Sequence, residues 1–400
     1  MNKEKRRVPK LRFPGFTEDW EQRKLNEFLS VSNFKNIDNK YNKNDVLSVS
    51  GDYGIVNQIE FQGRSFAGVS VSNYGLVETG DIVYTKSPLK LNPYGIIKAN
   101  RINAGIVSTL YAIYKTKKNC DSKFIEHYFN LDSRLNKYLK PLVNKGAKND
   151  MKVSSENALI GEVCFPHVTE QKLIAVFLDR LDLFITLHQR KLEHLNLKKK
   201  ALLQKLFPKN GARYPELRFP GFTDAWEQRK LSDITDVIMG QSPSSKNYTD
   251  NPNDNILVQG NADLKDGKVI PRLWTKEITK TIDKDGIILT VRAPVGDVAK
   301  TDYKVVLGRG VAGIKGNDFI YQFLQKLQYN RHWVSLSSGS TFESINSNDI
   351  KDLIIDIPSI EEQNKISMLL NNVNSIITLH QRKLEHLQLQ KKALLQQMFV

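Results

Sequence analysis

A few side chains in this sequence could, by type and spacing, act on a phosphodiester bond. Glu170-Gln171-Lys172 matches the last part of the Asp and Glu-x-Lys motif with which nucleases hold Mg²⁺. No Asp stands close upstream, and the related place later in the chain reads Glu362-Gln363-Asn364, without the lysine. Both segments are better explained as the start of a helix, where carboxylates are favourable. We therefore expect no metal-dependent nuclease site here.

Methyl transfer is a second chemistry to consider. Asn92-Pro93-Tyr94 is similar to the Asn-Pro-Pro-aromatic motif of amino methyltransferases, but it lacks one proline. The sequence also has no G-x-G-x-x-G followed by a helix and no phosphate-binding P-loop. Without a cofactor loop, this motif does not predict catalysis. We expect no catalytic residue and no cofactor in this chain.

The histidines and cysteines do not suggest a metal site either. His188 and His380 fall on apolar helical stripes, and His194 and His386 have identical surroundings, so all four are predicted to be packed or solvated helix residues. The only two cysteines lie far apart in the sequence and in no metal-ligand spacing, so we expect neither a disulfide framework nor a zinc site.

The elements that must position any site are duplicated. Leu11–Leu25 and Leu217–Leu231 are identical at 13 of 15 positions, at a shift of 206 residues. The segment ITLHQRKLEHL occurs at 185–195 and again at 377–387, at a shift of 192. The two stretches between these repeats, 26–184 and 232–376, differ in length and in nearly all of their sequence. This pattern indicates a fixed framework that carries two different recognition regions.

Apolar residues at spacings of three and four predict two long helices with a coiled-coil seam. The seam positions of the first are Leu173, Phe177, Leu181, Phe184, His188, Leu192, Leu195, Leu202 and Leu206; those of the second are Leu369, Val373, Ile376, His380, Leu384, Leu387, Leu394 and Met398. Ser359 with Glu362 forms a capping box for the second helix. Each helix should run for about 38 residues, or roughly 57 Å. Because the first is broken before the repeat resumes, we expect the two to pair antiparallel, with residue 400 returning close to residue 1.

The fold class that follows is mixed α/β: two globular domains separated by an antiparallel two-helix coiled coil, with a pseudo-twofold internal repeat. Short strands are expected at 80–84, 105–114, 286–291 and 353–357, and helices at 124–139 and 318–329. The predicted boundaries are an N-terminal segment (1–25), a first recognition domain (26–165), a central helix (166–211), the repeated N-terminal segment (212–231), a second recognition domain (232–357) and a C-terminal helix (358–400).

Composition and charge favour a nucleic-acid partner. With 40% hydrophobic residues, the chain is expected to fold into globular domains. Its 59 Lys and Arg residues outnumber its 43 Asp and Glu residues, and the net charge of +16 favours a polyanion. No run is long and apolar enough for a membrane helix, and no signal peptide is evident, so we expect no membrane partner and a cytoplasmic location.

In its motifs the chain resembles the DNA-specificity (S) subunits of type I restriction-modification systems. The paired LRFPGF segments ending in W-E-Q-R-K-L and the paired L-H-Q-R-K-L-E-H-L helices reproduce the arrangement of that family. Shorter strings that look like family segments are 239–244, 291–297 and 308–312 in the second variable region, and 63–65 and 80–84 in the first. The match covers essentially the whole chain.

The resemblance implies a DNA sequence-recognition subunit with no catalysis of its own, which reads a bipartite site on double-stranded DNA, one half per domain. It implies docking of two copies of a DNA adenine methyltransferase subunit and of restriction and translocase subunits, with S-adenosylmethionine, ATP and Mg²⁺ bound by those partners. Three alternatives stay open: a stand-alone tandem DNA-binding protein, an enzyme fused to specificity domains, and a coiled-coil scaffold that does not bind DNA.

Proteins distinguish base pairs chiefly through Arg or Lys side chains that bind guanine and Asn or Gln side chains that bind adenine, so we look for such residues in loops. The candidates in the first domain are Arg64, Ser65, Asn73, Tyr74, Lys86, Ser87, Lys90 and Asn92. Those in the second are Gln241, Ser242, Ser244, Ser245, Lys246, Arg292, Arg309, Ser338 and Ser340. Lys145 and Lys148 are predicted to contact phosphates.

The duplicated N-terminal segments allow two interpretations. Phe13, Phe16 and Trp20 surround a Pro-Gly turn and are predicted to anchor the chain against the helices. The alternative is that Arg12, Arg23 or Lys24 contacts DNA.

Overall fold

The chain forms two compact units, each built from parts that are far apart in the sequence. The computed structural model describes residues 7–86, 88–143, 153–209, 211–337 and 344–400. Unit 1 comprises Met1–Leu187 together with Leu384–Val400, and unit 2 comprises His188–Lys383. Each unit therefore contains one variable region and a portion of both long helices.

The core of unit 1 is a four-stranded antiparallel sheet in the order β2-β9-β6-β7. Ile82, Val83 and Tyr84 in the middle strand have no exposed surface, because helices or loops cover both faces of the sheet. The bounds of these strands are Leu29–Val31 (β2), Ile82–Thr85 (β6), Ile97–Ala99 (β7) and Tyr111–Thr116 (β9).

Smaller elements complete unit 1 around this sheet. The strands are β1 (Glu21–Lys24) paired with β10 (Glu162–Phe165), β3 (Leu47–Ser50) with β4 (Gly54–Asn57), and β5 (Gly75–Val77) with β8 (Gly105–Val107). The helices are α1 (Gln58–Gln62), α2 (Ser122–Phe129) and α3 (Asp132–Leu139), and short 3-10 helices lie at Leu25–Glu27, Lys43–Asp45, Lys140–Leu142 and Asn157–Leu159. The single helix expected at 124–139 is thus two helices, because the chain turns at Asn130 and Leu131.

Unit 2 contains the same central arrangement, with β12, β22, β19 and β20 in the places of β2, β9, β6 and β7. Its sheets run β12-β22-β19-β20-β16-β15 and β13-β17-β14-β21-β18. The strands are β11 (Glu227–Lys230), β12 (Val237–Met239), β13 (Tyr248–Thr249), β14 (Asn255–Val258), β15 (Leu264–Lys265), β16 (Lys268–Val269), β17 (Trp274–Thr275), β18 (Thr281–Ile282), β19 (Ile287–Thr290), β20 (Val298–Lys300), β21 (Val305–Leu307), β22 (Val311–Ile314) and β23 (Ile354–Ile357).

The helices of unit 2 are short apart from one that follows the sheet. They are α5 (Leu231–Ile234), α6 (Asp318–Tyr329), α7 (His332–Ser337) and α8 (Ser347–Lys351), with 3-10 helices at Ser245–Asn247 and Asn261–Asp263. α6 has the predicted bounds and follows β22 as α2 follows β9. Both begin at a polar cap, Asp121 in unit 1 and Asn317 in unit 2, whose side chain accepts a backbone N–H.

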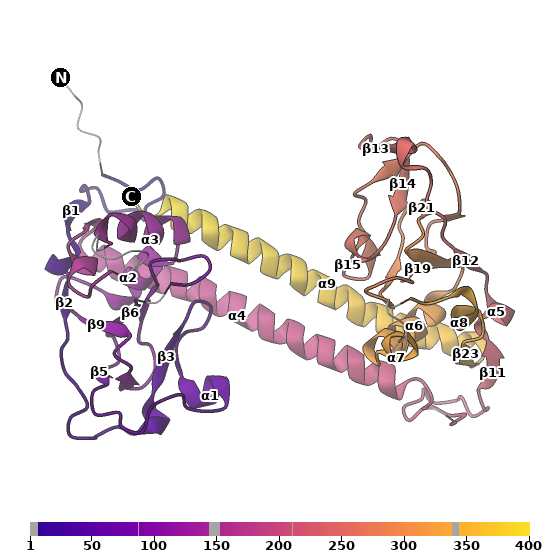
Figure 1. Cartoon of the computed structure of the whole chain (residues 1–400), viewed down its shortest axis with the longest axis horizontal. Coiled ribbons are helices and arrows are strands. Elements are labelled where there is room, and N and C mark those ends of the chain that lie inside the picture. Colours follow the sequence, from indigo (N-terminus) through magenta and orange to yellow (C-terminus); the bar gives the residue numbers. More distant parts are fainter. Residues whose placement is uncertain (1–6, 87, 144–152, 210, 338–343) are drawn as a thin grey trace. The chain divides into compact units, whose positions relative to one another are not determined.

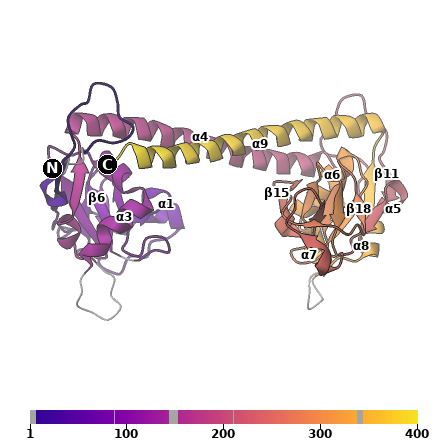
Figure 2. The ribbon, with the colours of Figure 1, turned by 90° about the horizontal axis from the view of Figure 1, so that it is seen from above.

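Two helices of 38 residues each, α4 (Val168–Lys205) and α9 (Ile360–Gln397), run through both units (Figure 1). In unit 2 His188 contacts His380, while Leu195, seven residues further on, packs with Val373 and Ile377, so the helices are antiparallel there. In unit 1 the first turns of α4 lie beside the last turns of α9, as Figure 2 also shows. The predicted helices and their antiparallel pairing are confirmed.

The buried stripe of α4 is displaced from the predicted seam at its start. Leu173 and Phe177 are exposed by 41% and 39%, whereas Ile174 and Leu178 are buried against the core of unit 1. The reason is that this end of α4 packs mainly on the recognition domain rather than on α9, so a neighbouring face is buried. The predicted seam is also wrong at Phe184 and Ile376, which are exposed by 55% and 44%, because the neighbouring Ile185 and Ile377 are buried instead. It holds at Leu195 and Val373, which pack together.

The duplicated N-terminal segments anchor the chain, as predicted. Trp20 and Trp226 are both 2% exposed and pack on aromatic rings of their own units. Arg12 binds Glu170 through two hydrogen bonds of 2.8 Å, and Arg218 binds Glu362 in the same way. These glutamates lie in the first turns of α4 and α9, so Arg12 holds the chain to a helix and is not available to DNA.

Candidate nucleic-acid interface

Three predicted reader residues of unit 2 meet around one hollow. The hollow has a volume of 460 Å³ and is lined by Ser242, Gln259, Gly260, Asn261, Arg292, Ala293, Arg309 and Gly310. These residues come from the ends of β12, β14, β19 and β21, where the strands pass into loops. The sheet therefore brings Ser242, Arg292 and Arg309 together although they are far apart in the sequence.

Glycines hold the loops of this hollow close to one another. A Cβ atom on Gly240 would lie 2.0 Å from the carbonyl oxygen of Gly308, and one on Gly310 would lie 2.0 Å from that of Gln259. Real Cβ atoms do not approach a carbonyl oxygen so closely, so larger residues would force the loops apart. The backbone N–H of Arg309 also donates to the hydroxyl of Ser242 at 3.0 Å. The turn that carries Arg309 is thus fixed before any ligand binds.

The guanidinium groups of Arg292 and Arg309 are exposed and have no hydrogen-bond or ion-pair partner among the residues that the structure describes. Each presents a planar fork of N–H donors, which matches the O6 and N7 acceptors of guanine or a phosphate. Two unpaired guanidinium groups beside one hollow make this the most suitable part of unit 2 for nucleic acid.

Sequence reasoning missed two polar residues of the same hollow. Gln259 donates to the hydroxyl of Tyr248 at 2.7 Å, and Asn261 donates to the carboxylate of Asp297. Both side chains could contact adenine. The sequence signal for them is a glycine flanked by Gln and Asn directly after a strand. It was missed because β14 was not predicted as a strand.

The other predicted residues of unit 2 lie outside the hollow's lining. Gln241 and Ser244 are exposed, and their backbones are held by Leu307 and Glu277 respectively. Ser245 and Lys246 belong to an exposed 3-10 helix. They stay predictions for contacts at the rim of the site.

The predicted residues of unit 1 do not gather at one place in the same manner. Arg64 lies over the exposed ring of Phe66, 4.6 Å from its centre, and Ser65 contacts Gln58. Asn73 is exposed, whereas the ring of Tyr74 packs on the small core formed by Val46, Val71 and Ile106.

Asn92 requires a correction. It is only 7% exposed and donates to Asp132 at 2.8 Å, so in this fold its amide holds the start of α3 and does not face a DNA groove. Lys86 is half-buried and Lys90 is exposed, and both remain available. The predicted contacts Ser87, Lys145, Lys148, Ser338 and Ser340 lie outside the described residues.

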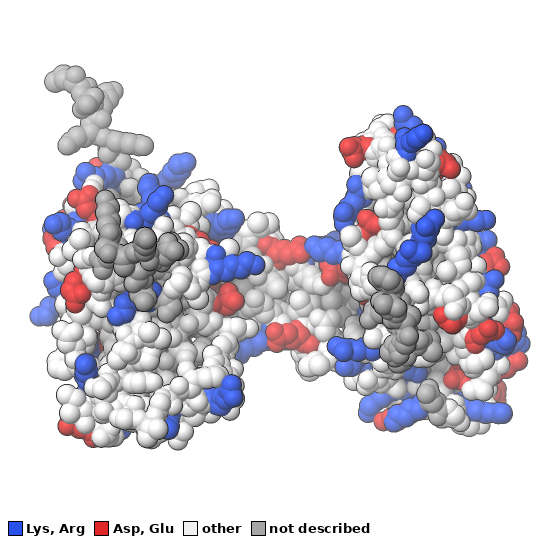
Figure 3. All heavy atoms as spheres, viewed as in Figure 1, with Lys and Arg blue, Asp and Glu red and all other residues white. Residues whose placement is uncertain are grey.

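On the face that Figure 3 shows, charge is spread over both units rather than gathered in one patch. Figure 3 shows Lys and Arg side chains among Asp and Glu on the visible face of both units, and the lower part of unit 1, over β5, is mostly uncharged. Within the described ranges, no group of three or more His, Cys, Asp and Glu side chains could hold a metal ion. In the same ranges, no helix has the length and hydrophobicity needed to cross a bilayer.

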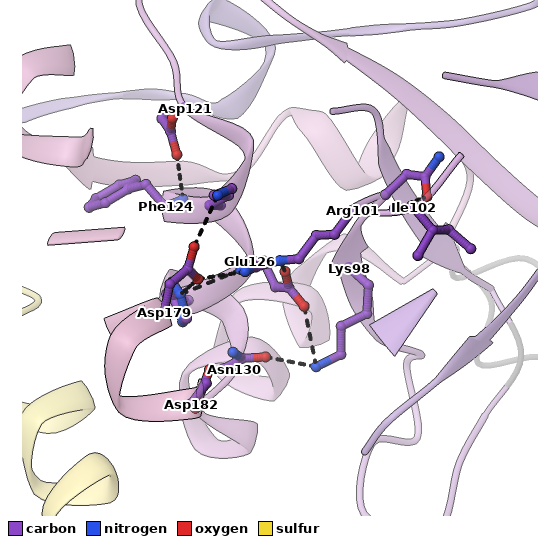
Figure 4. A network of polar contacts seen from close by, with 12 residues as sticks. Lys98, Arg101, Ile102, Asp121, Phe124, Glu126, Asn130, Asp179 and Asp182 are labelled. Atoms are coloured by element: carbon purple, nitrogen blue, oxygen red, sulfur yellow. Dashed lines mark hydrogen bonds and ion pairs between the residues drawn. The ribbon is translucent and has the colours of Figure 1, made fainter. Parts of the chain in front are cut away.

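A partly buried polar network joins the recognition domain of unit 1 to α4 (Figure 4). Asp179 of α4 accepts from His127 at 2.8 Å, contacts Lys123 at 3.1 Å and also binds Arg101. Arg101 binds Glu126 at 2.7 Å in turn. Although burial works in the opposite direction, the hydrogen bonds from His127 and Arg101 hold the pKa of Asp179 well below its usual range. The domain is therefore attached to the helix by a set of charges around one carboxylate.

The chain is similar to proteins of one family. The model of the type I restriction modification DNA specificity domain matches residues 223–389. A putative type I restriction enzyme MjaX specificity subunit of Methanocaldococcus jannaschii is 29% identical over 264 residues, which cover 63% of this chain and 62% of that relative. The MjaIX specificity subunit of the same organism is 28% identical over 38% of each chain. The chain thus matches less than two thirds of the length of these relatives.

Solved structures extend the likeness of the fold to the whole chain. A type I restriction-modification S subunit from M. genitalium has a TM-score of 0.65 at 14% identity and covers 98% of this chain and 99% of its own. A chain from a structure of the complex assembly and conformational transition of a type I R-M system has a TM-score of 0.56 at 20% identity, with the same coverage. The fold is therefore that of type I S subunits. In its sequence relatives as well, this chain is similar to DNA-specificity subunits of type I restriction-modification systems, the family that the duplicated motifs indicated.

Proposed function

We propose that this chain is the DNA-recognition subunit of a type I restriction-modification complex and performs no catalysis itself. It reads a bipartite site on double-stranded DNA, with one half read by the domain in each unit. The observation that carries the proposal is the hollow of unit 2, where Arg292 and Arg309 present unpaired guanidinium groups on rigid loops. Among the described residues neither guanidinium group has a hydrogen-bond or ion-pair partner, and each fits the edge of a base pair.

The long helices supply docking surfaces for partner subunits. Val176, Phe184 and Leu187 of α4 are exposed by 48%, 55% and 50%. Their counterparts 192 residues later, Met368, Ile376 and Leu379 of α9, are exposed by 67%, 44% and 67%. An exposed apolar stripe on a helix is typical of a protein interface. Because the stripe occurs once in each unit, it supports the binding of two copies of one adenine methyltransferase subunit.

Under this proposal the chemistry belongs to the partners. S-adenosylmethionine would be bound by the methyltransferase subunits, and ATP and Mg²⁺ by restriction and translocase subunits. The complex would act on chromosomal DNA, which places the chain in the cytoplasm.

Mapping methylated adenines in a host that carries this chain together with its methyltransferase subunits tests the proposal. We expect one bipartite methylated motif that disappears when only this chain is omitted. Exchange of residues 26–165 for those of a relative should change one half of the motif. A motif that persists without the chain would refute the proposal, and a change of both halves would refute the assignment of one half to each domain.

A further inference from the structure

The two recognition domains share one turn whose backbone is the same and whose side chains are not. In unit 1 this turn joins β8 to β9, and in unit 2 it joins β21 to β22. The N–H of Tyr111 donates to the oxygen of Ser108 at 3.1 Å, and the N–H of Val311 donates to that of Gly308 at 3.2 Å. We call residues 108–111 and 308–311 the reading turns.

A second pair of hydrogen bonds fixes the correspondence residue by residue. The N–H of Lys86, just after β6, donates to the oxygen of Leu110 at 3.4 Å. The N–H of Val291, just after β19, donates to the oxygen of Gly310 at 2.9 Å. Because β6 and β19 occupy the same place in their sheets, Thr109 matches Arg309, and Leu110 matches Gly310.

The side chains at the matched positions differ in chemistry: unit 2 has a charged hydrogen-bond donor where unit 1 has uncharged groups. Unit 2 presents the exposed, unpaired guanidinium of Arg309, with Arg292 across the same hollow. Unit 1 presents Thr109 and the side chain of Leu110, which is 61% exposed. A guanidinium donates two hydrogen bonds to guanine, whereas threonine and aliphatic methyl groups contact the 5-methyl group of thymine.

An exposed apolar residue is also attached to the strand pair that leads into the unit 1 turn. Phe34, 68% exposed, accepts a hydrogen bond from Leu76 of β5, the partner strand of β8 that leads into the turn. The one basic side chain tied to this turn by a described backbone bond is Lys86, which suits a phosphate better than a base edge. Unit 1 therefore offers methyl-group contacts where unit 2 offers bidentate hydrogen bonds.

Resting on the proposed function, we infer that the two half-sites differ in the base that the reading turns contact: unit 2 reads a guanine through Arg309, and unit 1 reads a thymine through Thr109 and Leu110. The recognised sequence has a guanine-containing half and a half in which an A·T pair is required at the corresponding position.

Base analogues test each contact separately, with the full complex of this chain and its methyltransferase subunits bound to an oligonucleotide that carries the mapped motif. Replacing the guanine by 7-deazaguanine removes the N7 acceptor and should weaken binding about 5- to 150-fold. Replacing the thymine of the other half by uracil removes only the methyl group and should weaken binding about 4-fold.

Matched variants decide which side chain senses each analogue. In Arg309→Thr the 7-deazaguanine effect should vanish while the uracil effect remains. In the double variant Thr109→Ser with Leu110→Ser the reverse should hold. Arg309→Lys keeps the charge and the turn but loses the bidentate geometry, so it should tolerate the analogue partially. The melting temperature of each variant, measured beside the binding titration, identifies any that does not fold, and Arg309→Lys then serves in its place.

The outcomes separate this inference from the function on which it rests. A complex that methylates no motif dependent on this chain would refute the proposed function. A bipartite motif whose binding responds to the analogues equally in wild type and in both variants would leave that function standing and overturn the inference. So would a motif in which Arg309→Thr relaxes an A·T position.

Discussion

Asp179→Asn should destabilise unit 1 more than any exposed charge change of the same kind. The substitution keeps the size of the side chain and removes the charge that Arg101, Lys123 and His127 contact. The side chain of Asp179 is 20% exposed and that of His127 is 0% exposed, whereas Arg101 and Lys123 are 34% and 50% exposed, so water replaces only part of what is lost.

The structure bounds the size of this effect. Hydrogen bonds to a charged group contribute about 1.5 to 3 kcal/mol each, but the amide oxygen of Asn can still accept one of them. Arg101 also keeps its bond of 2.7 Å to Glu126. We therefore expect a loss of about 2 to 3 kcal/mol, which for a unit of roughly 200 residues lowers the melting temperature by about 4 to 12 °C.

Differential scanning calorimetry of the full chain measures this shift. The matched control is Asp352→Asn, because Asp352 pairs with Lys230 at 2.8 Å on side chains that are 60% and 52% exposed. That pair should contribute less than about 1 kcal/mol. Equal shifts for the two variants would refute the argument that the Asp179 network attaches the domain to α4. A shift of the transition of unit 2 alone would do the same.

Three further predictions concern other parts of the fold. Glu170→Gln should lower the free energy of unfolding by about 3 kcal/mol in urea titrations, because it leaves the guanidinium of Arg12 without its buried partner, and a loss below 1 kcal/mol would contradict this. Burial and the neighbouring His188 lower the pKa of His380 below 6.5, so the folded state binds a proton less readily than the unfolded chain and stability should fall as the pH drops below about 6.5. Melting temperatures between pH 7.5 and 5.5 measure this, and a His380→Asn variant with an unchanged pH dependence would contradict it. Gly310→Ala should weaken DNA binding in titrations by disturbing the reading turn, at a cost in stability of about 1 to 3 kcal/mol, whereas Gly260→Ala, whose added Cβ meets no protein atom within 4 Å, should leave the stability nearly unchanged.

Much of the fold could be predicted from the sequence because the repeats are strong signals. Two long helices with the same apolar period, separated by Pro208 and Gly211, allow little besides an antiparallel pair. The pattern did not show which face of α4 is buried at its start. Ile174 and Leu173 are adjacent and equally apolar, and only the surface of the recognition domain, built from distant strands, selects Ile174.

The candidate site was predicted in part, for a similar reason. Arg292 and Arg309 could be found because glycines and a proline mark their loops. Gln259 could not, since β14 pairs in parallel with β21, some fifty residues later, and that pairing leaves no local pattern. Asn92 was placed in a loop correctly, but its burial depends on Asp132 of α3, which no spacing rule connects to it.

The contacts between the recognition domain and its long helix are chemically different in the two units. The position of Asp179 in α4 corresponds, 192 residues later, to Asn371 in α9, which accepts from Gln322 at 2.8 Å and donates to Asp318 at 2.7 Å. One joint is thus made from charges and the other largely from amides.

A second contact, one turn after Asp179 in α4, differs between the units in the same way. Lys391 pairs with Asp182 at 2.6 Å, whereas Lys199, at the equivalent position of α4, is buried under the ring of Tyr329, and desolvation lowers its pKa to about 8. Recombination that carried the first recognition domain into the second position would set Arg101, Lys123 and His127 against Asn371. The repeated helices therefore do not make the two domain positions interchangeable. A recognition domain that is moved to the other position also needs the helix residues that contact it.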